Sequence, residues 1–234
     1  MKILLAVFIT TFSTLSFAKT LWSDYSVTYL NGSDYEVGDN QRQVVTFEYA
    51  SGLTWGDNFM FVERMWSANK DVTLYGEWSP RIKLSEHRYG VFNNIYFSST
   101  FEVNAFSPAS GSSSDFVNVL LGLGTDISIP GFKFVKLSAY HRNNEIGDDN
   151  YQLTLSWAVP LGKLNYDGFI DYASAREGAT STMNFTSQLK YNLAPHLQLT
   201  SPLYVGVEYV WWQSKFGIDD VNENNVNFLV KYHF

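Results

Sequence analysis

The sequence predicts an all-β fold, a transmembrane antiparallel β-barrel of about 12 strands behind a cleaved N-terminal signal peptide. Three observations predict it: apolar and polar residues alternate along most of the chain, the charges gather on one face of the strands, and the last strand ends in Phe234. Strands that cross a membrane must close into a barrel, because lipid leaves no backbone group free to remain unpaired. Each such strand alternates outward apolar and inward polar residues over about 10 positions.

The first residues have the pattern of a secretory signal. Lys2 is followed by a mostly apolar run over 3–12, and Ser16-Phe17-Ala18 is a small-x-small cleavage site. We therefore expect a signal peptide at 1–18 and an outer-membrane barrel domain at 19–234. The alternative is a single membrane anchor, but the apolar run is shorter than the about 20 residues that a spanning helix needs.

Twelve segments show the alternation, and no amphipathic helix of convincing length competes with them. In the eighth segment, Leu153, Leu155 and Trp157 oppose Gln152 and Thr154. The fourth contains Pro80, which cannot donate to a ladder, so we expect a bulge or weak pairing there. The expected strands are 22–31, 43–52, 58–67, 72–84, 91–104, 115–126, 132–142, 150–159, 164–174, 182–192, 203–213 and 225–234.

The charges of these segments separate by face. On the apolar face only Arg64 and Lys133 occur, both near segment ends, where their side chains can reach the headgroups. A soluble β-sandwich would show the same alternation, so periodicity alone does not separate the two folds. The polar face carries Asp24, Glu48, Glu63, Glu77, Arg81, Lys83, Glu102, Asp126, Lys136, Arg142, Asp167, Asp171, Lys190, Glu208 and Lys231.

The connections also favour a barrel, in which short turns lie on one side and longer loops on the other. With both termini in the periplasm, the odd-numbered connections are extracellular, and those at 31–41, 106–115, 143–149 and 215–224 are long and mostly acidic. The connections at 67–71 and 192–202 break this trend. Outward aromatic residues could form the interfacial girdles, or could be ordinary core aromatics of a soluble fold: Trp66, Trp78, Trp157, Tyr172, Tyr191 and Trp211.

Composition excludes several functions. The chain has no cysteine, so it has neither disulfides nor a cysteine metal site, and its formal net charge of -7 argues against a nucleic-acid partner. The acidic pairs at 148–149 and 219–220 could meet divalent cations, but solvated surface charge is the favoured interpretation. We expect no metal site and no cofactor.

Catalytic residues are also not indicated. The four histidines are His87, His141, His196 and His233, and none forms a recognisable His–Ser arrangement for acyl transfer. Asp167 and Asp171 share a face and could in principle act as an acid–base pair, although charge networks inside a barrel are commoner. The sequence therefore predicts a protein that is not an enzyme.

The predicted inner face of the barrel is rich in aromatic residues as well as in charged ones. Aromatic rings could stack on a nucleoside base while charged groups hold the ribose, since base–aromatic stacking is worth about 1–3 kcal/mol per base. They could equally only fill a narrow barrel. The rings are Phe59, Phe61, Tyr75, Tyr96, Tyr140, Phe169, Tyr204 and Trp212.

Two short segments are distinctive, the run Gly-Leu-Gly-Thr-Asp-Ile at 122–127 and the Pro-Arg strand at 79–84. Both resemble segments of the Tsx-type family of nucleoside-specific channels. Each match is short, so the resemblance depends on the order and spacing of the matches along the chain. Further similarity lies at 47–49, 93–96, 159–161, 168–172 and 232–234.

The resemblance implies a monomeric twelve-stranded channel of the bacterial outer membrane that passes nucleosides and deoxynucleosides through weak lumen sites. Its expected partners are nucleosides, outer-membrane lipid and lipopolysaccharide, and for some members phage or colicin at the extracellular loops. A general small-solute pore, or a structural or receptor barrel, is the alternative. The expected substrate-binding residues are Glu48, Tyr75, Glu77, Arg81, Tyr96, Asp126, Phe169, Asp171 and Trp212.

The sequence departs from the family pattern in two places. Ser79 stands where an acidic residue is expected, and Tyr89-Gly90-Val91 replaces a Phe-Gly-Pro run. The chain is also shorter than typical members, which indicates trimmed loops. These departures bear on which substrate passes rather than on the fold.

Overall fold

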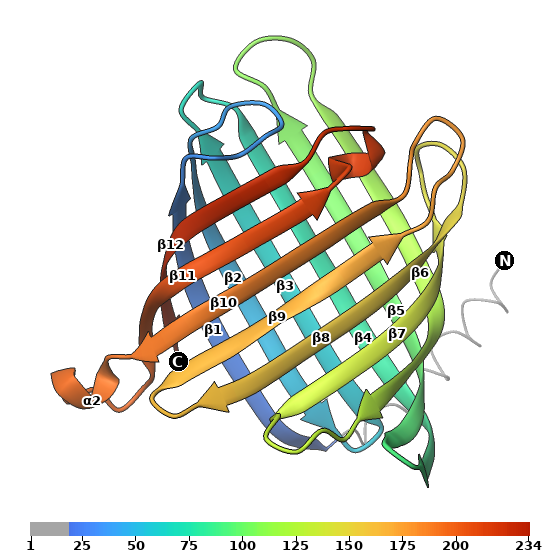
Figure 1. Ribbon diagram of the computed structural model, residues 1–234, viewed down its shortest axis with the longest axis vertical. Coiled ribbons are helices and arrows are strands. Elements are labelled where there is room, and N and C mark those ends of the chain that lie inside the picture. Colours follow the sequence, from blue (N-terminus) through green and yellow to red (C-terminus); the bar gives the residue numbers. More distant parts are fainter. Residues whose placement is uncertain (1–18) are drawn as a thin grey trace, which may run out of the picture.

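The computed structural model describes residues 19–234, and the expected signal peptide at 1–18 lies outside them. The described chain forms a closed barrel of twelve antiparallel strands, in which each strand pairs with its sequence neighbours and β1 pairs with β12 (Figure 1). This confirms the predicted fold class. The strands are β1 (Thr20–Gly32), β2 (Arg42–Leu53), β3 (Gly56–Ser67), β4 (Val72–Tyr89), β5 (Phe92–Ser107), β6 (Ser114–Ile127), β7 (Phe134–Asn143), β8 (Asn150–Leu161), β9 (Leu164–Ala173), β10 (Thr182–Asn192), β11 (Leu203–Gln213) and β12 (Glu223–His233).

Two short helices lie in the connections, α2 (Ala194–Leu197) and the 3-10 turn η2 (Lys215–Gly217). Among the described residues, no helix combines the length and the apolar composition required to cross a membrane.

The connections differ between the two ends of the barrel. At the lower end in Figure 1, which we call the turn end, the chain reverses in two residues at 54–55, 90–91 and 162–163. Gly90 and Gly162 supply left-handed φ angles of 63° and 64° in two of these turns. The opposite end, the loop end, carries the longer connections. The predicted exceptions are confirmed: 68–71 is short at the loop end, and 193–202, which contains α2, is long at the turn end.

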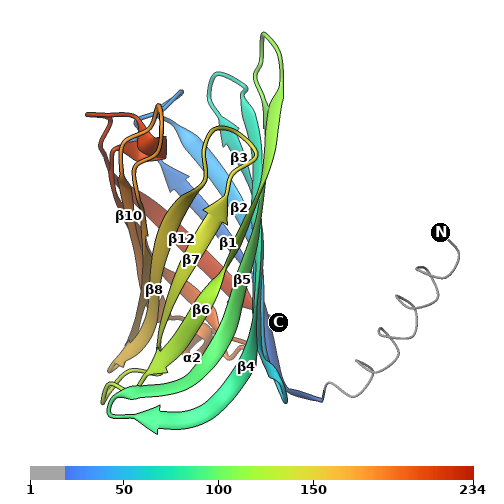
Figure 2. The ribbon, with the colours of Figure 1, turned by 90° about the vertical axis from the view of Figure 1, so that its right-hand side faces the viewer.

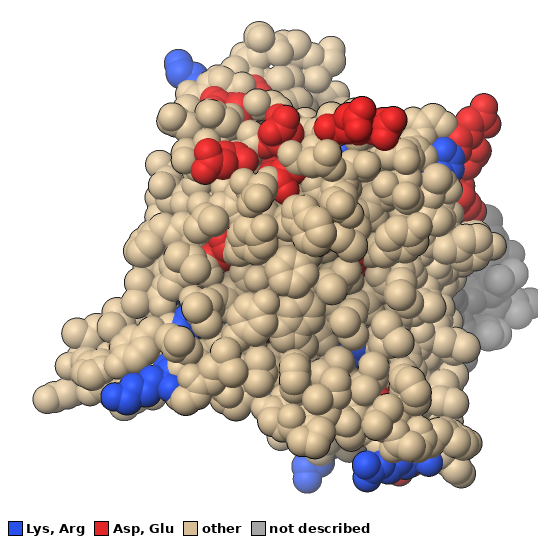
Figure 3. All heavy atoms as spheres, viewed as in Figure 1, with Lys and Arg blue, Asp and Glu red and all other residues tan. Residues whose placement is uncertain are grey.

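Charge follows the same division (Figure 3). The turn-end connections contain Lys133 and Lys163 and no acidic residue. The loop-end connections contain ten acidic residues against three basic ones, Lys70, Arg176 and Lys215. The acidic ones are Asp34, Glu36, Asp39, Asp71, Glu145, Asp148, Asp149, Glu177, Asp219 and Asp220.

The strand register turns the predicted polar face inward. Directly opposed residues share a face of the sheet, so Glu77 lies on the same side as its partners Phe61 and Glu102. The opposite face is apolar and exposed, with Leu74, Trp78 and Ile82 each more than 40 % exposed. The separation of charges that the alternation predicts is therefore the separation between lumen and outer surface.

Aromatic side chains occupy both ends of the outer face. Trp66, Tyr172 and Trp211 are near the loop ends of their strands, and Tyr191 is near the turn end of its strand. Trp157 lies closer to the middle of β8 and is only 8 % exposed, because it packs against Tyr166 and Phe185. Trp78 also lies near the middle of its strand, β4, where its ring stacks on Phe101. The outward Arg64 covers the Trp66 ring at 5.1 Å, a contact in which the guanidinium stays at the strand end. The named outward aromatic residues therefore lie toward the loop end more often than toward the turn end.

Pro80 weakens one ladder, as predicted. The register between β4 and β5 is the same before and after Ser79 and Pro80, but these two residues have no partners on β5. Side chains bridge the gap: the Ser79 and Thr100 hydroxyls lie 2.9 Å apart, and the Ser99 hydroxyl donates to the Pro80 carbonyl at 3.3 Å. The bulges of this pair lie further on, between Lys83 and Arg88. In Figure 2 this β4–β5 hairpin extends beyond the other strands at the turn end.

Candidate functional site: the barrel lumen

A network of charged side chains fills the lumen toward the turn end. The Arg81 guanidinium donates to Asp57 at 2.9 and 2.5 Å and to Asp126 at 2.8 Å. Lys136 reaches Asp57 at 3.2 Å. The Tyr96 hydroxyl donates to Asp126 at 2.7 Å, and its ring lies 4.1 Å below the guanidinium. We call these five residues the Arg81 network.

Strand pairing assembles this network. Asp57 is opposite Arg81 in the β3–β4 pair, and Asp126 is opposite Lys136 in the β6–β7 pair. Gly124, in the predicted 122–127 motif, lies opposite Tyr96. A Cβ there would stand 2.4 and 2.6 Å from the hydroxyls of Ser98 and Ser138, so only glycine leaves room for the hydrogen bond between these two serines.

Two further ion pairs lie in the same part of the lumen. Glu48 forms a close ion pair with Lys231 and accepts the Ser26 hydroxyl at 2.8 Å. Lys190 donates to both oxygens of Asp167, at 2.7 and 2.5 Å. In this half of the lumen, each of these carboxylates is therefore neutralised by a lysine or an arginine.

The half of the lumen nearer the loop end has the opposite balance. Five carboxylates point into it, Glu63, Glu77, Glu102, Asp171 and Glu208, and we call them the carboxylate belt. Within the described residues, a single salt bridge serves the belt, from Arg142 to Glu102 at 2.6 Å.

Neutral donors serve two of the other belt residues. Glu77 accepts the Tyr75 hydroxyl at 2.5 Å, and Asp171 accepts the Thr154 hydroxyl at 2.5 Å. Glu77 is close enough to Glu102 and Asp171 for the three charges to repel one another.

Glu208 and Glu63 complete the belt. Glu208 accepts the side-chain amides of Gln188 at 2.8 Å and Asn227 at 3.1 Å. Glu63 and Glu208 repel each other across the lumen. The belt as a whole is therefore a cluster of five carboxyl groups with one basic partner among the described residues.

Aromatic rings line the lumen beside the belt. Phe59 and Phe61 lie 6.0 Å apart between ring centroids, and Phe61 lies 5.7 Å from Tyr75. These three rings form a row along β3 and β4, with Glu63 and Glu77 next to it in the register. We call Phe59, Phe61 and Tyr75 the aromatic row.

Phe169 lies elsewhere on the lumen wall. It is opposite Ser156 on β8 and Thr186 on β10, two short side chains that leave the ring uncovered by its cross-strand neighbours.

The loop end of the lumen is closed in by a second aromatic group. The Lys215 ammonium lies 4.7 Å from the Trp212 ring, 5.3 Å from Phe216 and 5.8 Å from Tyr35, and it forms an ion pair with Glu223. Both members of the pair are almost fully buried, with side chains 4 % and 2 % exposed. We call these five residues the mouth cluster.

Burial changes the ionisation of two mouth residues that lie in the connections. The pKa of the Tyr35 phenol is raised, first because the ring is buried and then because Glu208, Glu63 and Glu223 repel a phenolate. The pKa of Lys215 is lowered, because the cost of burying the ammonium exceeds the attraction of Glu223. A residue of the β1–β2 connection therefore reaches the vicinity of the carboxylate belt.

The structure distributes the expected substrate-binding residues over the lumen instead of gathering them at one point. Arg81, Tyr96 and Asp126 belong to the Arg81 network, and Glu48 is paired with Lys231. Tyr75 and Glu77 are bonded to each other, with Asp171 in the same belt. Phe169 lies on the wall between β8 and β10, and Trp212 lies in the mouth cluster, where Lys215 covers its ring.

Several residues of the lumen were missed by the sequence reasoning. Asp57 and Glu223 lie one and two positions before the predicted starts of their strands, at 58 and 225. Their parity with Phe59 and Asn225 is the signal that could have placed them inside. Tyr35 and Lys215 lie in connections, where no alternation exists to indicate their direction.

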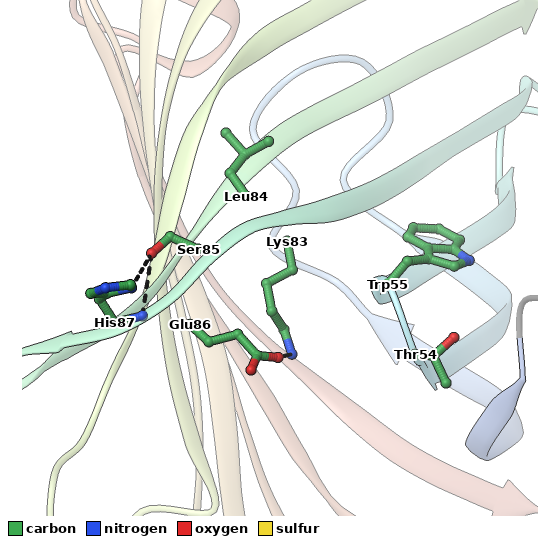
Figure 4. A pocket seen from close by; sticks show the side chains of 7 residues that line it. All are labelled: Thr54, Trp55, Lys83, Leu84, Ser85, Glu86 and His87. Atoms are coloured by element: carbon green, nitrogen blue, oxygen red, sulfur yellow. Dashed lines mark hydrogen bonds and ion pairs between the residues drawn. The ribbon is translucent and has the colours of Figure 1, made fainter.

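One histidine contacts a serine, although the sequence indicated no His–Ser arrangement for acyl transfer. Ser85 and His87 on β4 lie with Oγ and Nδ1 2.9 Å apart (Figure 4). The contact is local, because the residues are two positions apart and Ser85 Oγ also accepts the His87 backbone N–H at 3.3 Å. The nearby carboxylate, Glu86, is bonded to Lys83 at 2.9 Å and does not orient the imidazole. A cavity of about 570 Å³ lies beside this segment.

Comparison with known proteins finds similar structures but no similar sequence. No protein-family model matches the chain, and no curated protein matches it in sequence. A solved structure of the KdgM porin is similar over 89 % of this chain and 99 % of that chain, with 14 % identity and a TM-score of 0.53. KdgM porin in complex with disordered oligogalacturonate gives a TM-score of 0.51 at 13 % identity, covering 89 % of this chain and 99 % of that one.

Outer membrane phospholipase A from Escherichia coli is similar at the same level. It gives a TM-score of 0.52 at 11 % identity and covers 94 % of this chain and 96 % of that chain. At identities this low, likeness establishes fold and not activity. The protein therefore has the fold of the porins and other β-barrels of the bacterial outer membrane.

Proposed function

We propose that the protein is an outer-membrane channel for the passive, selective diffusion of nucleosides and deoxynucleosides through a narrow polar and aromatic lumen. The observation that carries the proposal is the aromatic row Phe59–Phe61–Tyr75 beside Glu63 and Glu77 on the inner face. A pore that passes only ions does not require a row of aromatic rings. A flat solute with hydroxyl groups can stack on the rings and donate hydrogen bonds to the neighbouring carboxylates.

The chemistry of the solute fits the charge of the lumen. A nucleoside is neutral, and its ribose hydroxyls and base N–H groups can donate hydrogen bonds to the belt carboxylates. Its base can stack on the rings, at about 1–3 kcal/mol for each good stack. Such contacts are individually weak and shared among several residues, which transport requires because each site must also release the solute.

The proposed location is the bacterial outer membrane, with the barrel as a monomer. The exposed apolar outer face, with aromatic side chains toward the strand ends, matches lipid. The acidic loop end would face the exterior and lipopolysaccharide, and its loops are the surface that a phage or colicin would contact (Figure 3). The turn end would face the periplasm.

The belt makes two other substrate classes less suitable. Oligogalacturonate, present in one KdgM structure, carries a carboxylate on each sugar, and the belt would repel such a polyanion. Phospholipid hydrolysis would need an oriented base, and no carboxylate orients the imidazole in the Ser85–His87 pair. A general small-solute pore is the second candidate, because it requires only the same barrel and no stacking on the aromatic row.

Liposome swelling tests the proposal. We expect vesicles containing the protein to swell faster in uridine and adenosine than in a sugar of similar size, because only the nucleosides stack on the aromatic row. Heat-modifiable migration in detergent provides the control for folding. Equal swelling rates for the three solutes would indicate a general pore and not a selective channel. No swelling at all would indicate a structural or receptor barrel.

Ion selectivity tests the belt independently of the nucleoside. Glu77→Gln or Asp171→Asn should reduce the preference for potassium over chloride, because each removes one of five carboxylates from a region with a single arginine. The measurement is the reversal potential across a bilayer in a KCl gradient, which should move toward zero. Glu177→Gln in the exposed loop at 174–181 is the matched control. An unchanged potential in both belt variants would contradict the assigned role of the belt.

A further inference from the structure

The connection between β1 and β2, residues 33–41, bends into the mouth of the barrel. Its Tyr35 ring lies 5.8 Å from the Lys215 ammonium, and the phenol is repelled by Glu63 and Glu208 of the carboxylate belt. The path from the loop end to the belt therefore passes this ring.

Contacts within the loop hold Tyr35 in that position. The Tyr35 backbone N–H donates to the Asn40 carbonyl at 3.2 Å. Arg42 donates to the carbonyls of Val37 and Asp39, the latter at 3.0 Å, and its guanidinium covers the Tyr35 ring at 4.8 Å. The loop is thus folded on itself and does not hang free over the opening.

One hydrogen bond ties the loop to the barrel wall. The Glu36 backbone N–H donates to Glu223 Oε2 at 2.9 Å. The same oxygen forms the ion pair with Lys215, so a single carboxylate joins loop 33–41 to the turn at 214–218. Glu223 is the first residue of β12, a fixed part of the wall.

The turn at 214–218 is held in an unfavourable backbone conformation. Ser214 and Phe216 have φ angles of 43° and 60°, in the left-handed region that residues with a side chain rarely occupy. Such a conformation persists only where other contacts impose it. Here the imposing contacts are the Lys215–Glu223 ion pair and the rings of Trp212 and Tyr35 around the ammonium.

We propose that residues 33–41 and 214–218 form a gate at the loop end of the lumen, with Tyr35 as the obstructing group and the Lys215–Glu223 pair as its latch. This deepens the proposed function, on which it rests, by assigning regulation to the channel. Removing one member of a buried ion pair leaves the other charge uncompensated, so the latch opens when either is lost. The strained turn then relaxes, and the loop is released from Glu223.

Single-channel recording in planar bilayers with KCl tests the gate. Tyr35→Ala removes the obstruction and Lys215→Met removes the latch, and both should raise the conductance or the fraction of time spent open. Arg176→Met is the matched control, because Arg176 ties two other loops at the same end through the carbonyls of Ile146 and Asp148. If folded Tyr35→Ala and Lys215→Met channels both conduct like the unmodified protein, the gate does not exist.

Thiol modification gives a second test that leaves the latch intact. The chain contains no cysteine, so Tyr35→Cys creates a unique reactive position. A cationic methanethiosulfonate reagent added at the loop end should remove most of the current through Tyr35→Cys and little through Asp34→Cys, whose side chain is exposed. Equal block in the two variants would overturn the placement of Tyr35 in the path, and this test still decides if Lys215→Met does not fold.

The two proposals fail separately. Potassium current that rises in the gate variants without any uridine uptake would refute the nucleoside proposal and leave the gate. Uridine uptake with unchanged currents in the gate variants would support the nucleoside proposal and refute the gate.

Discussion

Arg81→Met should lower the free energy of unfolding by about 3–5 kcal/mol, the usual result of removing one partner from a buried ion pair. The Arg81 side chain is only 6 % exposed, and it neutralises both Asp57 and Asp126. Without it, Asp57 retains only Lys136, and Asp126 retains only neutral donors. The cost arises because Asp126 loses its ion-pair partner and Asp57 keeps one cation where it had two.

Urea titration of the protein in lipid vesicles measures this effect. Lys83→Met, on the same strand, is the matched control, because Lys83 pairs with the exposed Glu86 and should change the midpoint little. Adding Asp126→Asn to Arg81→Met should recover part of the loss, since it removes the carboxylate that is left without an ion-pair partner. Equal stability of Arg81→Met and Lys83→Met would show that the Arg81 network does not stabilise the barrel.

Phe169→Ala should weaken nucleoside binding by about 1–3 kcal/mol, because it removes a ring that a base can cover. The short side chains opposite Phe169, Ser156 and Thr186, leave its face accessible from the lumen. Trp212 was expected to stack in the same way, but its ring already lies against Lys215 and Phe216. Trp212→Ala should therefore act on the gate more than on nucleoside affinity.

The measurement is nucleoside uptake into vesicles, or competition with a labelled nucleoside, at several concentrations. Leu155→Ala is the control, because Leu155 is opposite Leu137 and Ile170 on the outer face. It should leave transport unchanged, whereas Asp171→Ala should impair it. If folded Leu155→Ala impairs uptake as much as Asp171→Ala, the nucleoside pathway does not follow the inner face.

Most of the barrel could be predicted because lipid and lumen impose opposite requirements on alternate residues. All twelve predicted segments correspond to strands, and Thr182–Asn192 and Leu203–Gln213 match to the residue. The largest error is in β4, which was expected to end at 84 and continues to Tyr89. Beyond Leu84 the strand carries Ser85, Glu86, His87 and Arg88, and both faces become polar once the hairpin extends past the other strands.

The candidate site could be predicted only as a list of inward residues. Parity placed Arg81, Asp126 and Glu77 on the inner face. Which of these residues contact one another depends on the register between strands, and that register cannot be read from a single sequence. Asp57 became the partner of Arg81 because Trp66 pairs with Val72, an alignment set by the short connection at 68–71 between β3 and β4. The mouth cluster lay beyond prediction, since three of its five residues, Tyr35, Lys215 and Phe216, are in connections without periodicity.

The pairing of β1 with β12 has a consequence for the order of events in the life of the chain. His233 contacts Asp24 through its Nδ1 at 2.9 Å, and the Phe234 backbone N–H donates to the Tyr25 carbonyl, so residues more than 200 positions apart complete the ladder. A chain still under synthesis cannot make this contact, and any nascent or truncated form exposes two unpaired strand edges that invite aggregation. Closure must await the synthesis of β12, and until then β1 and the most recent strand keep unpaired edges.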